Sequence, residues 1–179
     1  MLEWQKINNT HYFGKSFSGH KGLDKWLDKK AYKANKQNDS RVFVLSDIEK
    51  SEVLSFYSLK LGQEPITNAP SDQRQKLANG SSGGLFPCVN IQWLGVNAKY
   101  QRKRYGEATL KEALVTCAGI FDATGGYGVV LTPDDGVEEF YTKYGFEEIG
   151  SGISKRMLMP SKTIFDFREM VQNKVMTAT

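Results

Sequence analysis

The sequence has few of the residues on which many enzyme mechanisms depend. Among its 179 residues there are only two cysteines, Cys88 and Cys117, and two histidines, His11 and His20. Neither cysteine lies in a Cys-x-x-Cys or Cys/His cluster, so we expect no metal site and interpret both as buried thiols. The shortage of histidine also excludes the nucleophile triads of most hydrolases.

Long apolar runs are absent as well. No stretch approaches the roughly 20 residues that a membrane-spanning helix needs, and the first residues lack the charged-then-apolar pattern of a secretion signal. We therefore expect a cytoplasmic protein with no membrane segment. The length suits a single domain over residues 1–179 with a full core.

The apolar spacing predicts a mixed order of strands and helices. Strands are expected at 2–7, 41–46, 53–59, 89–96, 127–131, 146–149 and 153–159, and helices at 22–35, 137–144 and 164–175, with another after residue 104. The segment 47–51 joins two of the strands into an antiparallel pair. Residues 62–86 show no periodicity and contain the Gly/Ser-rich stretch 79–84, so they predict a flexible loop, either bordering a substrate site or a plain insertion.

A basic turn follows the strand at 89–96 and opens directly into a helix that carries Gly106 near its start. Helix N-termini hold unpaired amides and partial positive charge, so this turn is suited to a diphosphate. A solvated basic loop, a nucleic-acid arm or a localisation signal would also account for the basic residues. The apolar face expected for this helix consists of Ala108, Leu110, Ala113, Leu114 and Cys117.

Positive charge is concentrated early in the chain, although the formal net charge is only +4. The lysines concerned are Lys21, Lys25, Lys29, Lys30, Lys33 and Lys36. They favour an anionic partner, and a solvated helix face explains them equally well.

Two motifs in order resemble those of the GNAT family of acetyl-CoA-dependent N-acetyltransferases. Residues 101–106 (QRKRYG) are similar to its Gln/Arg-x-x-Gly-x-Gly/Ala motif, and residues 139–146 (EFYTKYGF) are similar to its later "FY…GF" motif. The resemblance implies an α/β (α+β) fold with a mixed, mostly antiparallel central sheet flanked by helices. It also implies acetyl-CoA as co-substrate.

The chain further resembles the toxin branch of this family. The similarity lies in residues 17–27, 40–44 and 157–164, and it covers about 17–164 in all. It implies a toxin that acetylates the amino group of aminoacyl-tRNA and so blocks translation, with a small ribbon-helix-helix antitoxin and a homodimer as expected assemblies. Acetylation of a protein or small-molecule amine, or a catalytically weak acyl-CoA-binding module, are the alternatives.

The chain departs from the family pattern at two places. Arg104 stands where the motif has its first glycine, and a non-glycine residue there costs about 1 kcal/mol if its φ is positive. An arginine could offset that cost by pairing with phosphate. The second departure is Gln92-Trp93, which replaces a Gly-Arg pair of the toxin branch.

The resemblance also assigns roles to individual residues. Tyr141 carries over as the general acid for the coenzyme A thiolate, and a core tyrosine is the alternative reading. The residues expected to bind the cofactor are Leu94, Gly95, Val96, Gln101, Arg102, Lys103, Arg104, Tyr105, Gly106, Glu107 and Ala108. The residues expected to grip tRNA phosphates are Lys25, Lys29, Lys33 and Lys36.

Overall fold

The computed structural model describes the chain except for residues 15, 51, 81–82, 151–154 and 177–179. It divides into two compact units, Met1–Lys60 with Ile91–Ala113 and Leu61–Asn90 with Leu114–Thr179. Strands β3 (Glu52–Pro65) and β4 (Leu85–Val96) and helix α4 (Tyr105–Thr124) each continue from one unit into the other. That residues 1–179 behave as a single domain stays a prediction.

Within the described residues, seven strands form one mixed, mostly antiparallel sheet, which confirms the predicted fold class. Beside β3 and β4 they are β1 (Leu2–Lys6), β2 (Arg41–Asp47), β5 (Gly128–Leu131), β6 (Glu147–Ile149) and β7 (Arg156–Pro160). Their order is β1-β2-β3-β4-β5-β7-β6. The β1/β2, β2/β3, β5/β7 and β6/β7 pairs run antiparallel and the β4/β5 pair runs parallel.

The first unit carries a helical segment whose apolar side joins the core. It consists of α1 (Lys21–Trp26), the π-helical η1 (Leu27–Ala31) and α2 (Tyr32–Lys36), where the sequence predicts one helix at 22–35. Leu23, Leu27 and Ala31 are buried in one cluster with Phe56 of β3. The predicted pairing of β2 with β3 is confirmed, and residue 51 of the predicted connection lies outside the described residues.

Helix α4 buries a face that differs from the predicted one at its start. Leu110, Ala113 and Leu114 are buried as expected, but Ala108 is exposed and Thr109 is buried in its place. Two residues correspond to about 200° around a helix, so residue 108 cannot share a face with residue 110. The Thr109 hydroxyl instead lies 2.8 Å from the hydroxyl of Ser55, to which it is hydrogen-bonded.

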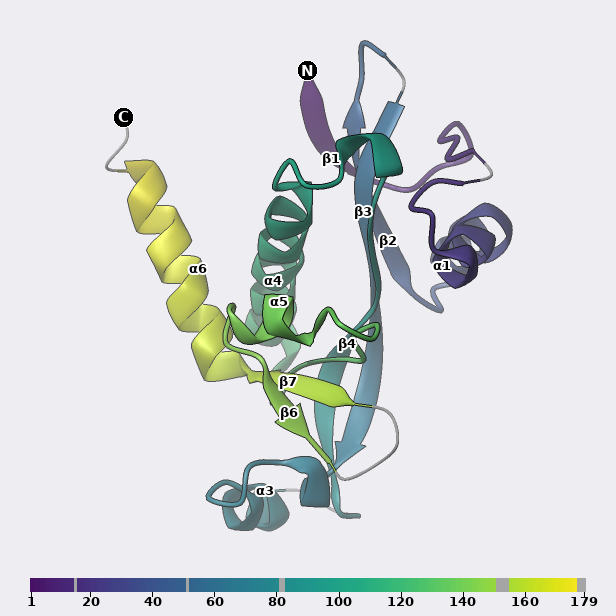
Figure 1. The fold of residues 1–179 in the computed structure, drawn as a ribbon. Coiled ribbons are helices and arrows are strands. Elements are labelled where there is room, and N and C mark those ends of the chain that lie inside the picture. The colour runs from purple at the N-terminus through teal and green to yellow at the C-terminus, as the bar shows by residue number, and fades with distance from the viewer. Residues whose placement is uncertain (15, 51, 81–82, 151–154, 177–179) are drawn as a thin grey trace. The chain divides into compact units, whose positions relative to one another are not determined.

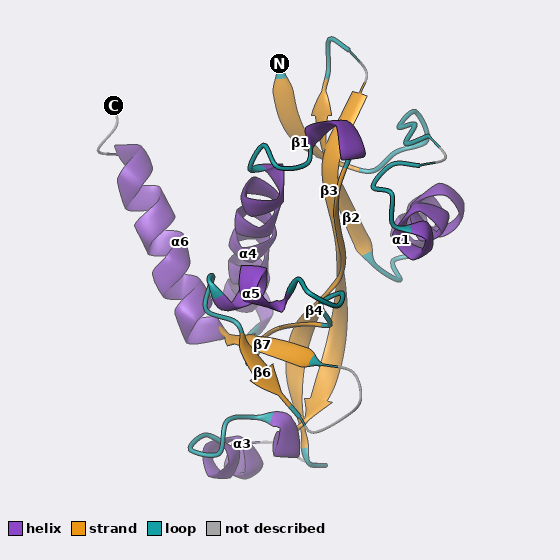
Figure 2. Ribbon diagram, viewed as in Figure 1, coloured by secondary structure: helices purple, strands orange, loops and turns teal. Residues whose placement is uncertain are grey.

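In the second unit, β5, α5, β6 and β7 follow one another along the chain in the predicted order, and β6 and β7 lie side by side (Figure 1). Helix α5 (Glu138–Thr142) lies within the predicted helix 137–144, and Gly145 follows it at a φ of +93°. Of the strand predicted at 153–159, residues 153 and 154 lie outside the described residues and β7 supplies the rest. Helix α6 (Ser161–Met176) starts directly after β7 and packs on β5 and β7 (Figure 2).

The prediction of a loop without secondary structure over 62–86 is wrong for the described part of that segment. It contains the end of β3, the short 3₁₀ helix η2 (Ile66–Asn68), helix α3 (Arg74–Gly80) and the start of β4. Ile66 and Leu77 pack on a core cluster that contains Phe86. These contacts are tertiary and do not repeat at a helical spacing, which is why the sequence did not reveal them. Residues 81 and 82 lie outside the described residues.

None of the helices in the described part of the chain has the length and apolar character needed to cross a bilayer.

Candidate active site

The end of β4 is fixed by hydrogen bonds within the first unit. The amide of Asn97 donates to the carbonyl of Leu54 at 2.8 Å, and the amide of Ala98 donates to the carbonyl of Phe17 at 2.7 Å. The Asn97 side chain donates to the carbonyl of Val53 at 3.1 Å. A short 3₁₀ helix, η3 (Ala98–Tyr100), then leads into the basic turn.

Two arginines of the basic turn have left-handed backbone conformations. Arg102 has a φ of 60° and Arg104 a φ of 65°. Arg104 therefore adopts a conformation that glycine takes freely and that costs another residue about 1–2 kcal/mol. The Gln101 side chain donates to the carbonyls of Ser18 and Val96 at 2.8 and 3.2 Å, so it anchors the turn.

The start of α4 leaves backbone donors at the turn. The amide of Ala108 donates to the carbonyl of Arg104 at 3.1 Å, so the amides of Tyr105 and Gly106 lie ahead of the first bond within the helix. A Cβ built on Gly106 would be in ordinary contact with Val96, at 3.8 Å from Cγ2, and would approach nothing more closely. No other part of the protein crowds the Cβ position of Gly106, which is compatible with the approach of a diphosphate to this helix start.

The side chains of the turn differ in how they are held. Those of Arg102 and Arg104 are exposed, whereas the Lys103 ammonium lies 5.5 Å from the centre of the Tyr100 ring. Glu107 is ion-paired with Lys111 at 2.6 Å. The two arginines are thus the turn residues whose side chains are most available to a phosphate.

The last residues of β4 differ in how deeply they are buried. Leu94 and Val96 are half-buried, while Gly95 is buried. A Cβ on Gly95 would lie 2.7 Å from Phe56 Cε1 and 3.0 Å from Leu23 Cδ1, so core packing requires this glycine. The sequence reading, which placed Gly95 beside the cofactor, missed this packing role.

Tyr141 belongs to the second unit and lies on α5. It is 9% exposed, and its ring contacts those of Phe140 and Phe146 at 5.1 and 5.8 Å between centroids. Burial, with a smaller effect of the Asp134 carboxylate, raises the pKa of Tyr141 to about 12. The hydroxyl therefore stays protonated at neutral pH and can act as a donor.

The early lysines lie on the exposed side of the first unit's helical segment. Lys25 and Lys29 line a groove of about 350 Å³ together with Lys21. Asp24 and Asp28 line the same groove, and the carboxylate of Asp24 is occupied by hydrogen bonds from Ser18 and Gly19. Lys33 and Lys36 lie farther along the segment and are exposed.

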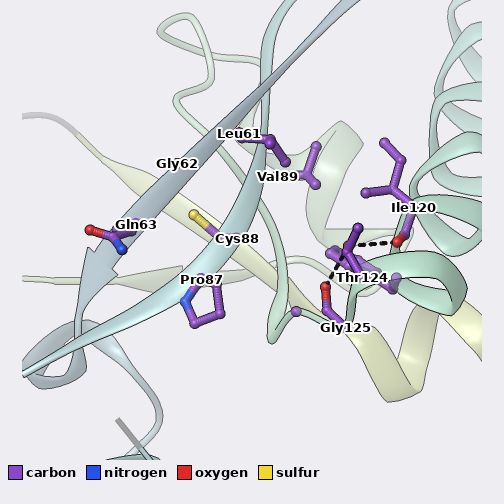
Figure 3. A pocket seen from close by; sticks show the side chains of 11 residues that line it. Leu61, Gly62, Gln63, Pro87, Cys88, Val89, Ile120, Thr124 and Gly125 are labelled. Atoms are coloured by element: carbon purple, nitrogen blue, oxygen red, sulfur yellow. Dashed lines mark hydrogen bonds between the residues drawn. The ribbon is translucent and has the colours of Figure 1, made fainter. Parts of the chain in front are cut away.

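A larger cavity of about 560 Å³ lies in the second unit and contains none of the predicted site residues. Figure 3 shows it between β3, β4 and the C-terminal end of α4, with Leu61, Val89 and Ile120 on its walls. The Thr124 hydroxyl at its edge is held by the carbonyls of Ile120 and Gly125 at 2.7 and 3.0 Å.

Sequence reasoning also missed a polar cluster in the second unit. Arg156 of β7 is ion-paired with the buried Glu64 of β3 and donates to the Asn90 side chain. Glu64 lies in the segment predicted as a loop, so no sequence signal identified it. In the described part of the chain, no group of three or more His, Cys, Asp or Glu side chains is placed to hold a metal ion.

Comparison with known proteins identifies two similar toxins. No protein-family model matches it. It is 29% identical over 165 residues to a probable toxin TacT of Sinorhizobium fredii, covering 87% of this chain and 88% of that protein. It is 28% identical over 131 residues to a tRNA-acetylating toxin of Mycobacterium tuberculosis, covering 73% and 75%. The chain is thus similar over most of its length to two proteins named as toxins, one of them for tRNA acetylation.

Solved structures show that its fold is that of these GNAT-type toxins. A Tyr-to-Phe variant of KacT matches with a TM-score of 0.83 at 19% identity, covering 92% of this chain and 98% of that one. AtaT complexed with acetyl-methionyl-tRNAfMet matches with a TM-score of 0.81 at 18% identity, with the same coverage. Other similar structures hold AtaTR with acetyl-CoA and the KacTA–DNA complex.

Proposed function

We propose that this protein is an acetyl-CoA-dependent N-acetyltransferase that modifies the amino group of aminoacyl-tRNA and thereby blocks translation. The observation that carries the proposal is the relationship to two toxins over most of their length, one of them named for tRNA acetylation. A protein acting on this substrate works in the cytoplasm, where aminoacyl-tRNA is used.

The basic turn and the start of α4 are the proposed binding place for the coenzyme A diphosphate. The amides of residues 102–108 would hold the phosphates, and Gly106 leaves the approach open. Acetyl-CoA supplies an activated acetyl group on a thioester. The left-handed Arg102 and Arg104 shape the turn and carry exposed guanidinium groups that are suited to phosphate oxygens. Leu94, Gly95 and Val96, where β4 ends, are proposed to lie beside the pantetheine arm.

Tyr141 is proposed to protonate the departing thiolate. Formation of the new N–C bond releases a proton from the amine, and cleavage of the C–S bond requires one at sulfur. A hydroxyl that receives one proton as it gives up another balances this exchange without a net change in its own charge. Because the pKa of Tyr141 is about 12, its hydroxyl is protonated at the start of each turnover.

A dedicated base is not required for this acceptor. The amino group of an aminoacyl ester is less basic than a lysine side chain, so a large share of it is already neutral near pH 7. This difference favours aminoacyl-tRNA over a protein lysine as the acceptor.

The exposed lysines of the first unit's helical segment are proposed to bind tRNA phosphates. Lys25, Lys29, Lys33 and Lys36 recur along one segment, as contacts to a regularly charged backbone require. The π-helical η1 contains Lys29 and widens the helix at that point.

A small DNA-binding antitoxin is the proposed protein partner. AtaT is bound to the C-terminus of its antitoxin AtaR in one similar structure, and KacTA is bound to DNA in another. A ribbon-helix-helix fold for that antitoxin and a homodimer of this chain stay predictions.

Expression of the full chain without a partner in bacteria tests the proposed function. We expect growth arrest and N-acetylated aminoacyl-tRNA in the extracted RNA, and neither effect with Tyr141→Phe. Normal growth with unmodified aminoacyl-tRNA at confirmed protein levels would reject the toxin function and leave a protein or small-molecule amine as the acceptor.

A further inference from the structure

A groove of about 480 Å³ lies beside the basic turn, and all residues that line it belong to the first unit. Its lining includes Ala98 and Lys99, and the turn begins two residues after Lys99, at Gln101. It also includes Phe17, whose carbonyl accepts from the Ala98 amide at 2.7 Å. The groove is therefore fixed next to the place proposed for the coenzyme A diphosphate.

This groove meets the smaller groove of the early lysines at Ser16. Ser16 is exposed and lines both, with Tyr12 and Phe13 in one and with Lys21 and Lys25 in the other. A polyanion that contacts the lysines of the helical segment can thus continue past Ser16 into the groove beside the turn. Both grooves lie within the first unit, so this path crosses no boundary between the units.

Two neighbouring aromatic residues of the groove differ in exposure. Phe13 is half-buried, and its ring lies 5.5 Å from that of Phe17 and 6.4 Å from that of Phe56 between centroids, so it belongs to the edge of the core. Tyr12 is 78% exposed. Most of the Tyr12 surface is therefore available to a planar ligand, such as a nucleobase, that stacks on its ring.

Two lysines make the groove suitable for an anion. The side chains of Lys50 and Lys99 are 69% and 74% exposed, and they lie 3.6 Å from Asp47 and 3.0 Å from Glu52. The Glu52 carboxylate also accepts from the Tyr100 hydroxyl at 2.6 Å. Exposed ion pairs contribute little free energy, so both ammonium groups can turn toward a phosphate. Two cations against the one carboxylate of the lining favour an anionic ligand.

We propose that this groove binds an unpaired nucleotide of tRNA, with its base stacked on Tyr12 and a phosphate beside Lys50 and Lys99. An aromatic ring among lysines suits single-stranded nucleic acid, because the ring takes the face of any base and the cations follow the backbone. A base within a helix has both faces covered by its neighbours, so only an unpaired one can stack on the ring. The assignment rests on the proposed function and adds a contact to its substrate.

Binding of deacylated tRNA and of acetyl-CoA to the purified full-length protein tests the assignment. Tyr12→Ala removes the ring, and Tyr12→Phe keeps it. We expect Tyr12→Ala to weaken tRNA binding about 10-fold, a typical effect of losing one base stack. Tyr12→Phe should bind tRNA like the wild type, and the Kd for acetyl-CoA should be the same in all three proteins.

Two controls separate this contact from general effects. A perfectly paired RNA duplex offers no free base within its stem, so it should bind the wild type and Tyr12→Ala equally. Phe165→Ala removes a half-buried aromatic ring of α6 in the second unit, where the ring contacts Arg168, and it should leave tRNA binding unchanged. Ultraviolet crosslinking followed by mass spectrometry should attach a nucleotide of bound tRNA to the peptide that contains Tyr12.

Equal tRNA affinities of the wild type and Tyr12→Ala would overturn the assignment, as would an equal loss of affinity for the duplex. Weaker acetyl-CoA binding with unchanged tRNA binding would make coenzyme A the occupant and overturn it too. If Tyr12→Ala does not fold, the Lys50→Gln/Lys99→Gln variant decides, because an unchanged salt dependence of tRNA binding overturns the assignment. A wild type that neither binds tRNA nor acetylates aminoacyl-tRNA would reject the proposed function itself, which is a different result.

Discussion

Arg104 is a non-glycine residue held in a left-handed backbone conformation. Its φ of 65° is the conformation that glycine adopts without cost. The chain accepts backbone strain at this turn and places a cation where a phosphate is expected. Left-handed non-glycine residues are common at ligand-binding loops, so this conformation is consistent with the proposed role of Arg104 in phosphate binding.

Two substitutions of Arg104 separate the backbone effect from the charge effect. Arg104→Gly removes both the strain and the charge, whereas Arg104→Gln removes only the charge. We expect the Gly variant to be about 1 kcal/mol more stable to unfolding than the Gln variant. Both should bind acetyl-CoA more weakly and with a smaller dependence on salt than the wild type.

Denaturant unfolding and calorimetric titration measure the two effects. Equal unfolding free energies for the Gly and Gln variants would show that residue 104 is not left-handed in solution. Wild-type affinity in both would show that the guanidinium does not bind phosphate.

Tyr141→Phe tests the general acid. Removing the hydroxyl should lower kcat about 100-fold, a typical value for a lost acid, and leave the Kd for acetyl-CoA nearly unchanged. The pKa of Tyr141, about 12, lies above the ordinary value, so the acid form persists as pH rises. The wild-type rate should therefore show no alkaline decline caused by this residue up to about pH 10.

Tyr144→Phe provides the control, since Tyr144 packs on the same Phe140 at 5.3 Å between ring centroids. Steady-state kinetics over a pH series give all the values. Loss of activity in both variants alike would show that the segment 138–146 is merely sensitive to substitution.

Among the single elements, strands and helices with a regular apolar repeat were predicted from the sequence. Elements that are held only by tertiary contacts were not. The strands at residues 41–46 and 89–96 and the helix after residue 104 have strong apolar patterns, and the structure contains all of them. Helix α3 has only Leu77 half-buried and no apolar stripe, so it could not be recognised. Its place depends on packing and on contacts such as the 2.7 Å hydrogen bond from Tyr127 to Gln73.

The site was predicted unevenly for the same reason. The turn and Tyr141 lie in short linear motifs, which a resemblance can identify residue by residue. Glu64, Asn90 and Arg156 are far apart in sequence and come into contact because their strands belong to one sheet. No short sequence motif could therefore identify them. The buried Thr109–Ser55 contact was missed in the same way.

The lysines of the first unit's helical segment should determine how strongly tRNA binding depends on salt concentration. The triple substitution of Lys25, Lys29 and Lys33 to Gln should raise KM for aminoacyl-tRNA and lower the salt dependence of binding by about two to three in log–log slope. Acetyl-CoA affinity should stay the same. The matched control is the same change at the exposed Lys76, Lys143 and Lys162, which alters net charge equally.

Filter binding over a series of salt concentrations measures both slopes. A change of equal size in the control triple would mean that overall charge, and not this segment, governs tRNA binding.

At the scale of the whole molecule, the proposed cofactor residues belong to the first unit and Tyr141 to the second. Binding and turnover should therefore be separable. Acetyl-CoA at 100 times its Kd should stabilise the wild type and Tyr141→Phe alike, by about 2.7 kcal/mol. Thermal unfolding measures this, and no stabilisation of the wild type at saturating acetyl-CoA would contradict the assignment of the turn.

We propose that the acceptor is the amino group of aminoacyl-tRNA. Its most direct test is incubation of the purified protein with acetyl-CoA and a mixture of aminoacyl-tRNAs, followed by mass spectrometry of the released aminoacyl group. We expect an added acetyl group on the α-amine that depends on acetyl-CoA and is strongly reduced in Tyr141→Phe. Unmodified aminoacyl-tRNA, under conditions in which the protein acetylates another amine, would contradict it.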